Sequence, residues 1–581
     1  MQQRNLPFLI VSTIPLLGIA SWLFAAADRP GPNLPPRISG SKQLTFDGLA
    51  KSSLATDGTD LYFTELSGEN SIIAKVPAVG GDISKFEVNF PNAELLDVSE
   101  AHSTLLAADY SSASSSGYPF WVYALHGGAA QRLGDLTGHE AVWSPDGRQV
   151  LLLKGPTLYV ADGKGNPEKE LVTVKGTPYY PKFSPDGKRV RFSVGETQSN
   201  TSTIWEVNTD GTGLHEWLPN WKEVSSKCCG NWSKDGRYYF FQAASNSSAD
   251  TGDLYAVSET IGRTDKKKAE PPVKLTQGSI SFSRPVFAAN NKTMWTLGLN
   301  TRVAVVSYDP GSGKYVPFLS GISATDLDFS ADGQWVAFVS VPEGTLWRCK
   351  IDGSERRQLT SSGSRAALPR WSPDGKRIAY VKVQPGKPWA IRMVPAEGGA
   401  SEALIEEPMT QVDINWNREG DQIIFGRVTQ HSSEGLSILS YDLKSHTVTA
   451  VPGSEGLFSP RLSPDGRYIA ALSGDLTKLM LYDTASKKWS RWQTLESGAL
   501  SYPIWAPDSK SIYFEDLVSG EGAYCRANVG ESHYEHVFLQ RGIERYLGPF
   551  GLWSGRTPNG SVLFVREAST REIYELQVEL P

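Results

Sequence analysis

One pattern of hydrophobic and polar positions returns along most of the chain. Apolar residues, often aromatic, precede a Ser-Pro-Asp-Gly tetrapeptide or a close variant, and a second, largely apolar stretch follows it. Clear copies lie at 141–153, 181–193, 230–242, 327–339, 369–381, 460–472 and 503–515. Proline presets φ, aspartate bonds the local backbone and glycine adopts the left-handed conformation, so the tetrapeptide predicts a tight turn. The pattern therefore predicts two strands joined by that turn, the second alternating as in residues 377–381.

The turn aspartates give the length of the repeat. Asp146, Asp186 and Asp235 are separated by 40 and 49 residues, and the longer gaps elsewhere are near doubles of that length. Weaker copies fill those gaps, at 99–108, 288–298 and 417–426, and further copies lie around Asp57 and at 556–565. The total is about twelve repeats of about 45 residues, which is the length of a four-stranded propeller blade.

The predicted fold is all-β: a β-propeller of about twelve four-stranded blades, arranged as two six-bladed rings, because one ring of twelve would leave a wide hole. The last repeat stops after a third strand at 571–581, so its outer strand has to come from elsewhere. Residues 41–48 and 314–321 resemble outer strands that could close the two rings and remove free edges. We expect the first propeller at 38–313 and the second at 314–581.

The N-terminus carries a separate signal. Residues 6–27 form an uncharged stretch of 22 residues, and a helix of that length would span about 33 Å, close to the hydrocarbon thickness of a membrane. Residues 1–27 are therefore expected to be a retained transmembrane anchor. The alternative is a signal peptide cleaved near Ala27, with secretion of the rest, and Pro15 would kink a spanning helix. Residues 28–37 are a Pro-rich tether, and everything beyond them is expected outside the cytoplasm, in the periplasm if there is an outer membrane.

Composition agrees with a turn-rich β protein and excludes one class of partner. Gly (55), Pro (36) and Trp (17) are abundant, and the net charge is −6. A nucleic-acid-binding protein would need a basic face, which this mild acidity does not supply.

The repeats, each centred on a Ser-Pro-Asp-Gly turn, resemble those of TolB-like propellers, a branch of the WD-repeat-like group, over roughly residues 38–581. The hydrophobic segment together with KQLTFDG, NAELLDVS, CCGNW, GTLWRCKIDGSERRQLT and GSEGLFSP is similar to one bacterial set of membrane-tethered winged-helix regulators, whose propeller lies outside the membrane. Only five residues precede the hydrophobic segment here, so we expect no DNA-binding domain like that of this set, and its transcriptional role is not implied.

The sequence offers no catalytic constellation, so no catalytic, cofactor-binding or metal-binding residues and no cofactor are predicted. No GxSxG nucleophile elbow occurs, which removes the catalyst of the peptidases that carry similar repeats. The turn aspartates lie singly in their own turns, and the run 266–268 is one basic loop. The cysteines (Cys228, Cys229, Cys349 and Cys525) include no CxxC pair and are expected to be half-buried thiols, although a redox or metal role for the adjacent pair is an alternative. His533 and His536 lie close together but would need a further ligand.

Two features could bind a ligand. Long polar loops follow the second strands at 110–119, 195–204, 243–252 and 428–437, and variable loops on a rigid scaffold often carry recognition, although these could also be decoration. First-strand charges in the second ring could line a channel mouth or could pair between blades instead: Asp326, Asp328, Arg370, Asp413 and Arg461.

The function predicted from these features is a membrane-anchored, extracytoplasmic scaffold or sensor that binds a protein, a peptide or an envelope polymer without catalysis. The alternatives are an enzyme with its site in a propeller channel, of lyase, cyclase or hydrolase type, and an accessory propeller of a peptidase-like system. Fold alone does not decide among them.

Overall fold

The computed structural model describes residues 35–67, 70–112, 117–166, 168–196, 201–244, 252–259, 271–361, 364–384, 387–405, 409–429, 432–495, 499–517, 522–548 and 550–581. These residues form fifty β-strands, and no helix occurs among them. Within this part of the chain, accordingly, no helix is long and apolar enough to cross a membrane. The expected anchor at 6–27 lies outside the described residues.

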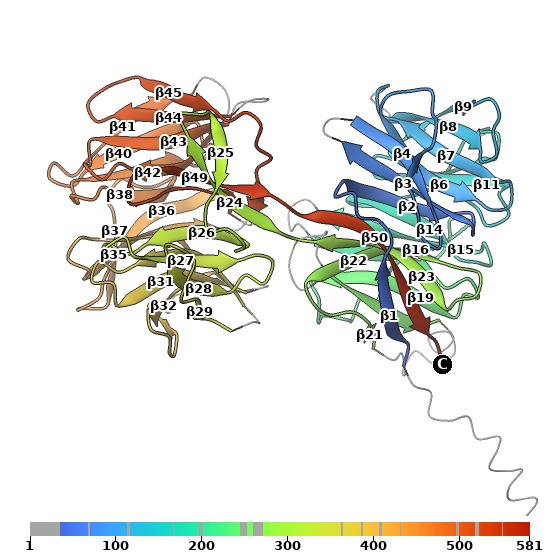
Figure 1. Cartoon of the computed structure of the whole chain (residues 1–581), viewed down its shortest axis with the longest axis horizontal. Coiled ribbons are helices and arrows are strands. Elements are labelled where there is room, and N and C mark those ends of the chain that lie inside the picture. Colours follow the sequence, from blue (N-terminus) through green and yellow to red (C-terminus); the bar gives the residue numbers. More distant parts are fainter. Residues whose placement is uncertain are drawn as a thin grey trace, which may run out of the picture.

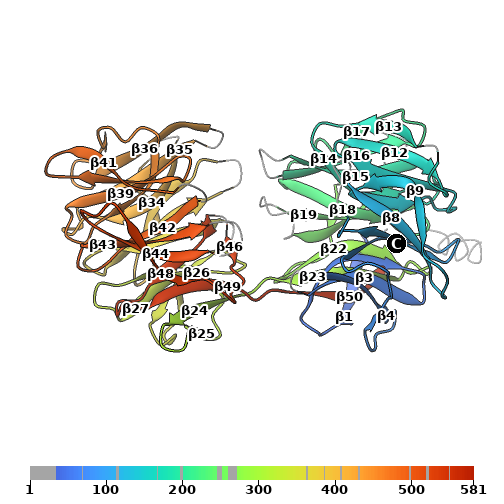
Figure 2. The same cartoon turned by 90° about the horizontal axis from the view of Figure 1, so that it is seen from above.

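Twelve four-stranded antiparallel sheets and one two-stranded sheet account for all the strands. The innermost strands contact one another in two closed cycles of six: β2, β6, β10, β14, β18 and β22, and then β26, β30, β34, β38, β42 and β48. The two rings lie side by side and are joined by a narrow double crossing (Figures 1 and 2). The prediction of an all-β propeller fold is confirmed.

The blades of the first ring are listed from the inner strand outwards. They are β2–β5 (Ala50–Thr56, Asp60–Ser67, Asn70–Pro77, Ser84–Lys85), β6–β9 (Ala93–Ser99, Thr104–Asp109, Tyr118–Ala124, Gln131–Gly138), β10–β13 (Glu140–Trp143, Gln149–Lys154, Thr157–Asp162, Lys169–Thr173), β14–β17 (Thr177–Phe183, Arg189–Glu196, Thr201–Asn208, His215–Trp217), β18–β21 (Ser226–Trp232, Tyr238–Ala244, Asp253–Ser258, Val273–Lys274), and the closing blade β22, β23, β50 and β1 (Ile280–Phe287, Thr293–Asn300, Thr570–Glu579, Arg37–Gln43).

The second ring follows the same plan. Its blades are β26–β29 (Ala324–Phe329, Trp335–Ser340, Leu346–Lys350, Arg357–Gln358), β30–β33 (Arg365–Trp371, Arg377–Val383, Ala390–Pro395, Glu402–Ala403), β34–β37 (Thr410–Trp416, Gln422–Thr429, Ser432–Asp442, Thr447–Ala450), β38–β41 (Leu457–Leu462, Tyr468–Ser473, Lys478–Asp483, Lys488–Thr494), β42–β45 (Ala499–Trp505, Ser511–Leu517, Ala523–Asn528, Tyr534–Leu539), and the closing blade β48, β49, β24 and β25 (Ser554–Arg556, Val562–Glu567, Val303–Asp309, Lys314–Pro317). The small sheet pairs β46 (Leu547–Gly548) with β47 (Gly551–Leu552).

Each closing blade joins strands from distant parts of the chain. In the first ring β50 fills the third place, paired with β23 on one side and with β1 on the other. In the second ring β24 and β25 continue the sheet that β48 and β49 begin. The segments at 41–48 and 314–321 thus do supply outer strands, as their pattern suggested.

The expected boundary between residues 313 and 314 is wrong, however. It falls inside the β24–β25 hairpin, which belongs wholly to the second ring, while 570–579 belongs to the first. The first ring comprises 37–300 with 570–579, and the second comprises 303–567. The pattern of a third strand shows that it needs two neighbouring strands but not which ring provides them. The repeats therefore could not predict that 570–579 belongs to the first ring.

The second strand of each blade is buried on both faces, because another blade covers each face of its sheet. In β31 the side chains Ile378, Ala379, Tyr380 and Val381 are all buried, so the expected alternation of buried and exposed positions does not hold there. Strands covered on both faces are typically apolar throughout. Indole groups add blade-to-blade hydrogen bonds, as where Trp505 Nε1 donates to the Arg461 carbonyl at 2.8 Å. The hydrophobic cores therefore lie between blades.

Candidate functional site

One position of the repeat faces the axis of each ring. It lies four residues before the first residue of the tight turn, at a bulge where the inner strand takes a positive φ. In the first ring this position holds Tyr180 (φ 50°), Cys229 (φ 58°) and Arg284 (φ 55°) on three neighbouring blades. A bulge bends the strand and redirects its side chain, which is how these groups converge from separate blades.

In the second ring the same region holds the charges singled out from the sequence, and four of the five are bound to a neighbouring blade. Arg461 Nη1 donates to Asp413 Oδ1 at 2.9 Å, and both residues are buried. The Asp326 carboxylate accepts the Leu368 N–H at 3.2 Å.

The Asp328 carboxylate accepts the Trp371 N–H at 2.7 Å, and burial raises the pKa of Asp328 to about 6. Arg370 Nη1 donates to the carbonyl of its own neighbour, Pro369, at 2.8 Å. Pairing between blades, rather than an open charged mouth, is thus what the structure shows for Asp326, Asp328, Asp413 and Arg461.

The axis of the first ring differs, because its central cation has no such partner. Arg284 lies with its guanidinium carbon 4.9 Å from the centroid of the Tyr180 ring. Among the described residues, no hydrogen bond or ion pair reaches that guanidinium. Burial alone would lower the pKa of Arg284, but the neighbouring Cys229, Tyr180, Glu140 and Glu94 raise it. The Tyr180 hydroxyl is buried and likewise lacks a hydrogen-bond partner within the described chain. Within the described residues, the five N–H donors of the Arg284 guanidinium and the Tyr180 hydroxyl therefore have no hydrogen-bond partner.

Two carboxylates from neighbouring blades complete this cluster. Glu94 on β6 accepts from the Ser52 hydroxyl at 3.0 and 3.2 Å, and Glu140 on β10 accepts the Tyr180 N–H at 2.7 Å. Burial raises the pKa of Glu94 to about 7, against the lowering effects of Arg284 and of the Ser52 hydrogen bond. Glu94 is therefore poised between its neutral and charged forms near neutral pH. We call Ser52, Glu94, Glu140, Tyr180 and Arg284 the axial cluster.

The axial cluster reaches the loop-bearing face through an aromatic pair. Tyr110 begins the polar loop at 110–119, is 36% exposed, and packs against Tyr118 with ring centroids 4.2 Å apart and ring planes tilted by 34°. Burial raises the pKa of Tyr110, and the negative charges of Glu94 and Glu140 raise it further. The middle parts of the four long loops, at 113–116, 197–200, 245–251 and 430–431, lie outside the described residues.

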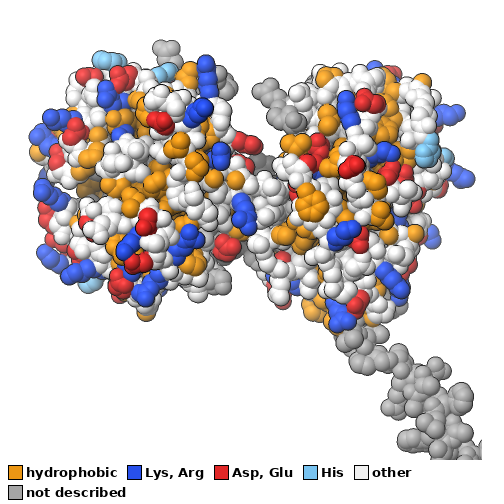
Figure 3. Space-filling view, in the orientation of Figure 1, with side chains coloured by type: hydrophobic (Ala, Val, Ile, Leu, Met, Phe, Trp, Pro, Cys, Tyr) orange, Lys and Arg blue, Asp and Glu red, His pale blue; other side chains and the backbone are white. Residues whose placement is uncertain are grey.

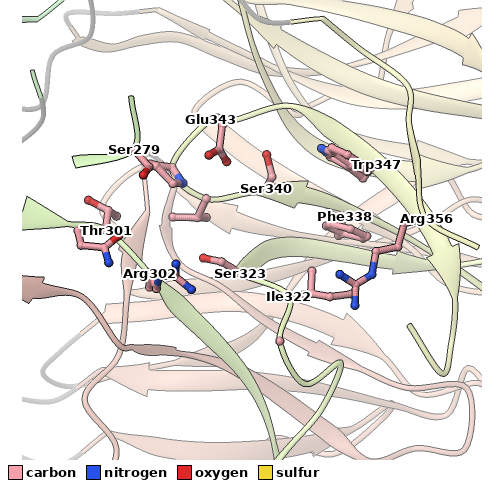
Figure 4. A pocket seen from close by; sticks show the side chains of 14 residues that line it. Ser279, Thr301, Arg302, Ile322, Ser323, Phe338, Ser340, Glu343, Trp347 and Arg356 are labelled. Atoms are coloured by element: carbon pink, nitrogen blue, oxygen red, sulfur yellow. The ribbon is translucent and has the colours of Figure 1, made fainter. Parts of the chain in front are cut away.

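A separate pocket of about 290 Å³ lies where the chain crosses between the rings (Figure 4). Its polar end holds Ser279, Thr301, Arg302 and Glu343, and its other end holds Phe338 and Trp347. Three of these residues belong to the crossing or to the blade before it, so the repeats alone could not reveal the pocket.

The remaining candidates behave as structural groups. All four cysteines are buried and unpaired, and burial raises the pKa of Cys349 to about 11. They are more deeply buried than expected. Each turn aspartate bonds within its own turn, as Asp146 does with Ser144 and Arg148. The basic run 266–268 lies outside the described residues, and charges of both signs are interspersed over the face seen in Figure 3.

The axial cluster was missed from the sequence for a physical reason. Its five members are of four residue types, and they come together only because the inner strands of five blades converge. A signal did exist: Ser52, Glu140, Tyr180 and Arg284 each lie four residues before a tight turn. Comparing that position across repeats would have singled out the polar residues at the axis.

No protein-family profile matches the chain. Over 190 residues it is 28% identical to the "Uncharacterized peptidase YuxL" of Bacillus subtilis (strain 168), a match that covers 31% of this chain and 26% of YuxL. The chain thus spans about a quarter of the length of that curated relative.

Solved structures similar to this chain are propeller proteins at low identity. They include a protein described as a TolB from Agrobacterium tumefaciens (19% identity, TM-score 0.37, 46% of this chain and 98% of that one). The tricorn protease (14%, TM-score 0.32, 83% and 49%) and the GH74 enzyme of Niastella koreensis (12%, TM-score 0.35, 85% and 85%) are also similar. Similarities at this level indicate nothing about activity. The assignment of the propeller fold rests on the two closed cycles of sheets.

Proposed function

We propose that this chain is a binding or sensor scaffold, and that the axial cluster of its first ring recognises a carboxylate on a peptide, protein or envelope polymer. The observation that carries the proposal is the guanidinium of Arg284, which lies at the axis without an ion-pair partner among the described residues. A guanidinium fits a carboxylate with two parallel hydrogen bonds, and this geometry gives specificity as well as affinity.

Two further features support a bound acidic group. The free Tyr180 hydroxyl could donate a third hydrogen bond, and buried polar groups normally have a partner. Glu94 can lose its charge near neutral pH, which would reduce repulsion of an incoming anion. The Tyr110–Tyr118 pair offers aromatic surface at the entrance, suited to the next segment of the ligand.

The test is a binding measurement with the full chain in detergent. The probes are peptide pairs that differ only in a C-terminal carboxylate or carboxamide, together with soluble cell-wall fragments that carry carboxylates. We expect binding of the carboxylate forms, and a loss of at least about tenfold in Arg284→Met, because a charge-assisted bond contributes roughly 1.5–3 kcal/mol. Arg370→Met, at the axis of the second ring, is the matched control and should bind like the wild type. Equal affinity of the wild type and Arg284→Met for every probe would remove the proposal.

We also propose that residues 6–27 anchor the chain and that both rings lie outside the cytoplasm. The length and lack of charge of that segment support this. Protease added to spheroplasts should then remove the rings and leave a small N-terminal fragment. Release of rings whose first residue lies near Asp28 would favour the cleaved-signal alternative, and full protection would contradict both.

A second function, a channel enzyme, is favoured by Glu94 alone. A carboxyl group with a pKa of about 7, beside a second carboxylate and a tyrosine, has the properties of a general base. Glu94→Gln separates the two functions: in a scaffold it should bind the carboxylate probes with little change, whereas in an enzyme it should keep binding and abolish turnover of the bound compound.

A further inference from the structure

Three donor groups of different chemistry meet on the blade β42–β45 of the second ring. Asp516 on β43, Cys525 on β44 and His536 on β45 come from adjacent strands, which lie next to one another in Figure 1. Their carboxylate oxygen, thiol sulfur and imidazole nitrogen all lie within 4.8 Å of one another. Cys525 and His536 are direct cross-strand partners, so their side chains share a face.

The hydrogen bonding of this cluster is incomplete. Asp516 is 4% exposed; one of its oxygens accepts from the Tyr534 hydroxyl at 3.2 Å, and the other, Oδ1, is buried without a partner among the described residues. Within the same part of the chain, no Lys or Arg lies within ion-pair distance of this carboxylate, and the neighbouring Glu515 takes Arg545 instead. A buried carboxylate oxygen with neither a hydrogen bond nor a cation beside it is costly, and bound cations commonly remove that cost.

The donor set identifies the class of cation. Sulfur, nitrogen and oxygen donors together suit a borderline-soft ion such as Zn²⁺, which binds at about 2.0–2.3 Å and holds its ligands roughly 3.5 Å apart in a tetrahedron. Small rotations of side chains now within 4.8 Å of one another would reach that spacing. Asp516 and Cys525 are buried and His536 is exposed, so the fourth position faces the solvent side of the blade.

We propose that Asp516, Cys525 and His536 form a binding site for a divalent transition metal of the zinc class, with one coordination position open. The site lies in the second ring and is independent of the axial cluster. Of the two histidines that lie close together in the sequence, His536 belongs to this group, whereas His533 lies 3.7 Å from Glu531 and takes no part in it. On binding, the metal displaces the thiol proton of Cys525, which leaves to solvent, and no bond other than S–H is broken.

The test uses the full chain freed of metal by chelation, with Co²⁺ and Zn²⁺ as probes. We expect one Co²⁺ per chain with a thiolate-to-cobalt charge-transfer band in the near ultraviolet, and competition by Zn²⁺. Cys525→Ser should abolish that band, and His536→Ala and Asp516→Asn should each weaken Zn²⁺ binding by at least about tenfold. His533→Ala is the matched control and should bind Zn²⁺ like the wild type.

His536 is exposed, so its variant should fold and keep the test decisive. Zn²⁺ should raise the melting temperature of the wild type and of His533→Ala but not that of His536→Ala. Absence of the charge-transfer band, or Zn²⁺ affinity unchanged in His536→Ala, would overturn the proposal. So would an equal loss in His533→Ala, because the two histidines would then be acting together.

Discussion

At the scale of single residues, each tight turn is held by contacts within a few positions. Ser372 Oγ donates to Asp374 Oδ1 at 2.6 Å, the Lys376 N–H donates to the same oxygen at 3.0 Å, and Gly375 takes a φ of 69°. Every partner lies within two residues of the aspartate, so this short segment specifies the turn whichever blade carries it.

Loss of the turn carboxylate should therefore have a modest and local cost. We expect Asp374→Ala to lower the free energy of unfolding by about 1 kcal/mol, because two local hydrogen bonds are lost at an exposed site. Asp374→Asn retains an acceptor oxygen and should cost less. Urea unfolding of both variants measures this, and an equal cost for Ala and Asn would show that the hydrogen bonds are not what matters.

Glu94 should make stability depend on pH in an unusual direction. Burial raises its pKa to about 7 in the folded chain, from an ordinary value of 4.5, so the folded state holds the proton more tightly than the unfolded state. The free energy of unfolding should then be highest below the ordinary pKa. It should fall as pH rises towards 7, by up to roughly 3 kcal/mol, and level off above that.

Glu94→Gln removes this titration. Urea midpoints at pH 5 and pH 8 should differ less in the variant than in the wild type, and identical pH dependence would contradict the raised pKa.

At the scale of elements, β50 decides whether the first ring is closed. It pairs with β23 along eight residues and with β1 on its other edge. Side chains reinforce the pairing: Glu572 on β50 accepts from the Thr45 hydroxyl at 2.6 Å and lies 3.1 Å from Lys51, which is fully buried. Removing β50 would expose two sheet edges and would take away one of the two carboxylates that pair with the buried Lys51, the other being Asp47.

A chain ending at Ser569 should therefore lose the first ring and keep the second. Limited proteolysis should degrade residues 37–300 while 303–567 stays resistant, because the second ring contains no part of β50. The control ends at Glu579 and keeps the whole strand, so it should behave like the full chain. Resistance of both rings in the shorter chain would show that β50 is dispensable.

The position of β50 also shows how much of the fold could be predicted from the sequence. The Ser-Pro-Asp-Gly turns predict the strands on either side of them because the determining contacts are local. Which ring includes 570–579, and whether Arg284 lies near Glu94, depends on contacts between residues that are hundreds of positions apart. The pattern of apolar residues does not specify which distant segments pair. The charges of the second ring show the same limit: Asp413 and Arg461 were singled out, but only the structure shows that they satisfy each other.

At the scale of the whole molecule, the rings are tied together twice. The chain passes from the first ring to the second between β23 and β24 and returns between β49 and β50 (Figures 1 and 2). The first ring therefore contains strands from both sides of a break placed at either crossing, whereas all the strands of the second ring lie on one side of such a break.

A cut at one crossing should not separate the rings. With a protease site inserted between Thr301 and Arg302, cleavage should give two fragments that co-elute on native size exclusion, because β50 holds the second fragment in the first ring. The fragments should separate in denaturant. The uncleaved insertion variant is the control, and separation under native conditions would show that β50 alone does not hold the rings together.

Because β50 closes the first ring from the end of the chain, it also sets the order in which the rings can be completed as the chain emerges from the ribosome. Residues 37–300 are made first, yet their ring lacks its third closing strand until residue 579 has appeared. The second ring has all its strands once residue 567 is made, so the half synthesised later can finish folding earlier. For the length of some 270 residues of synthesis the first ring has two unpaired edges, which is the interval in which such edges tend to associate with other chains. During that interval the edges of β23 and β1 have to be kept from pairing with other chains.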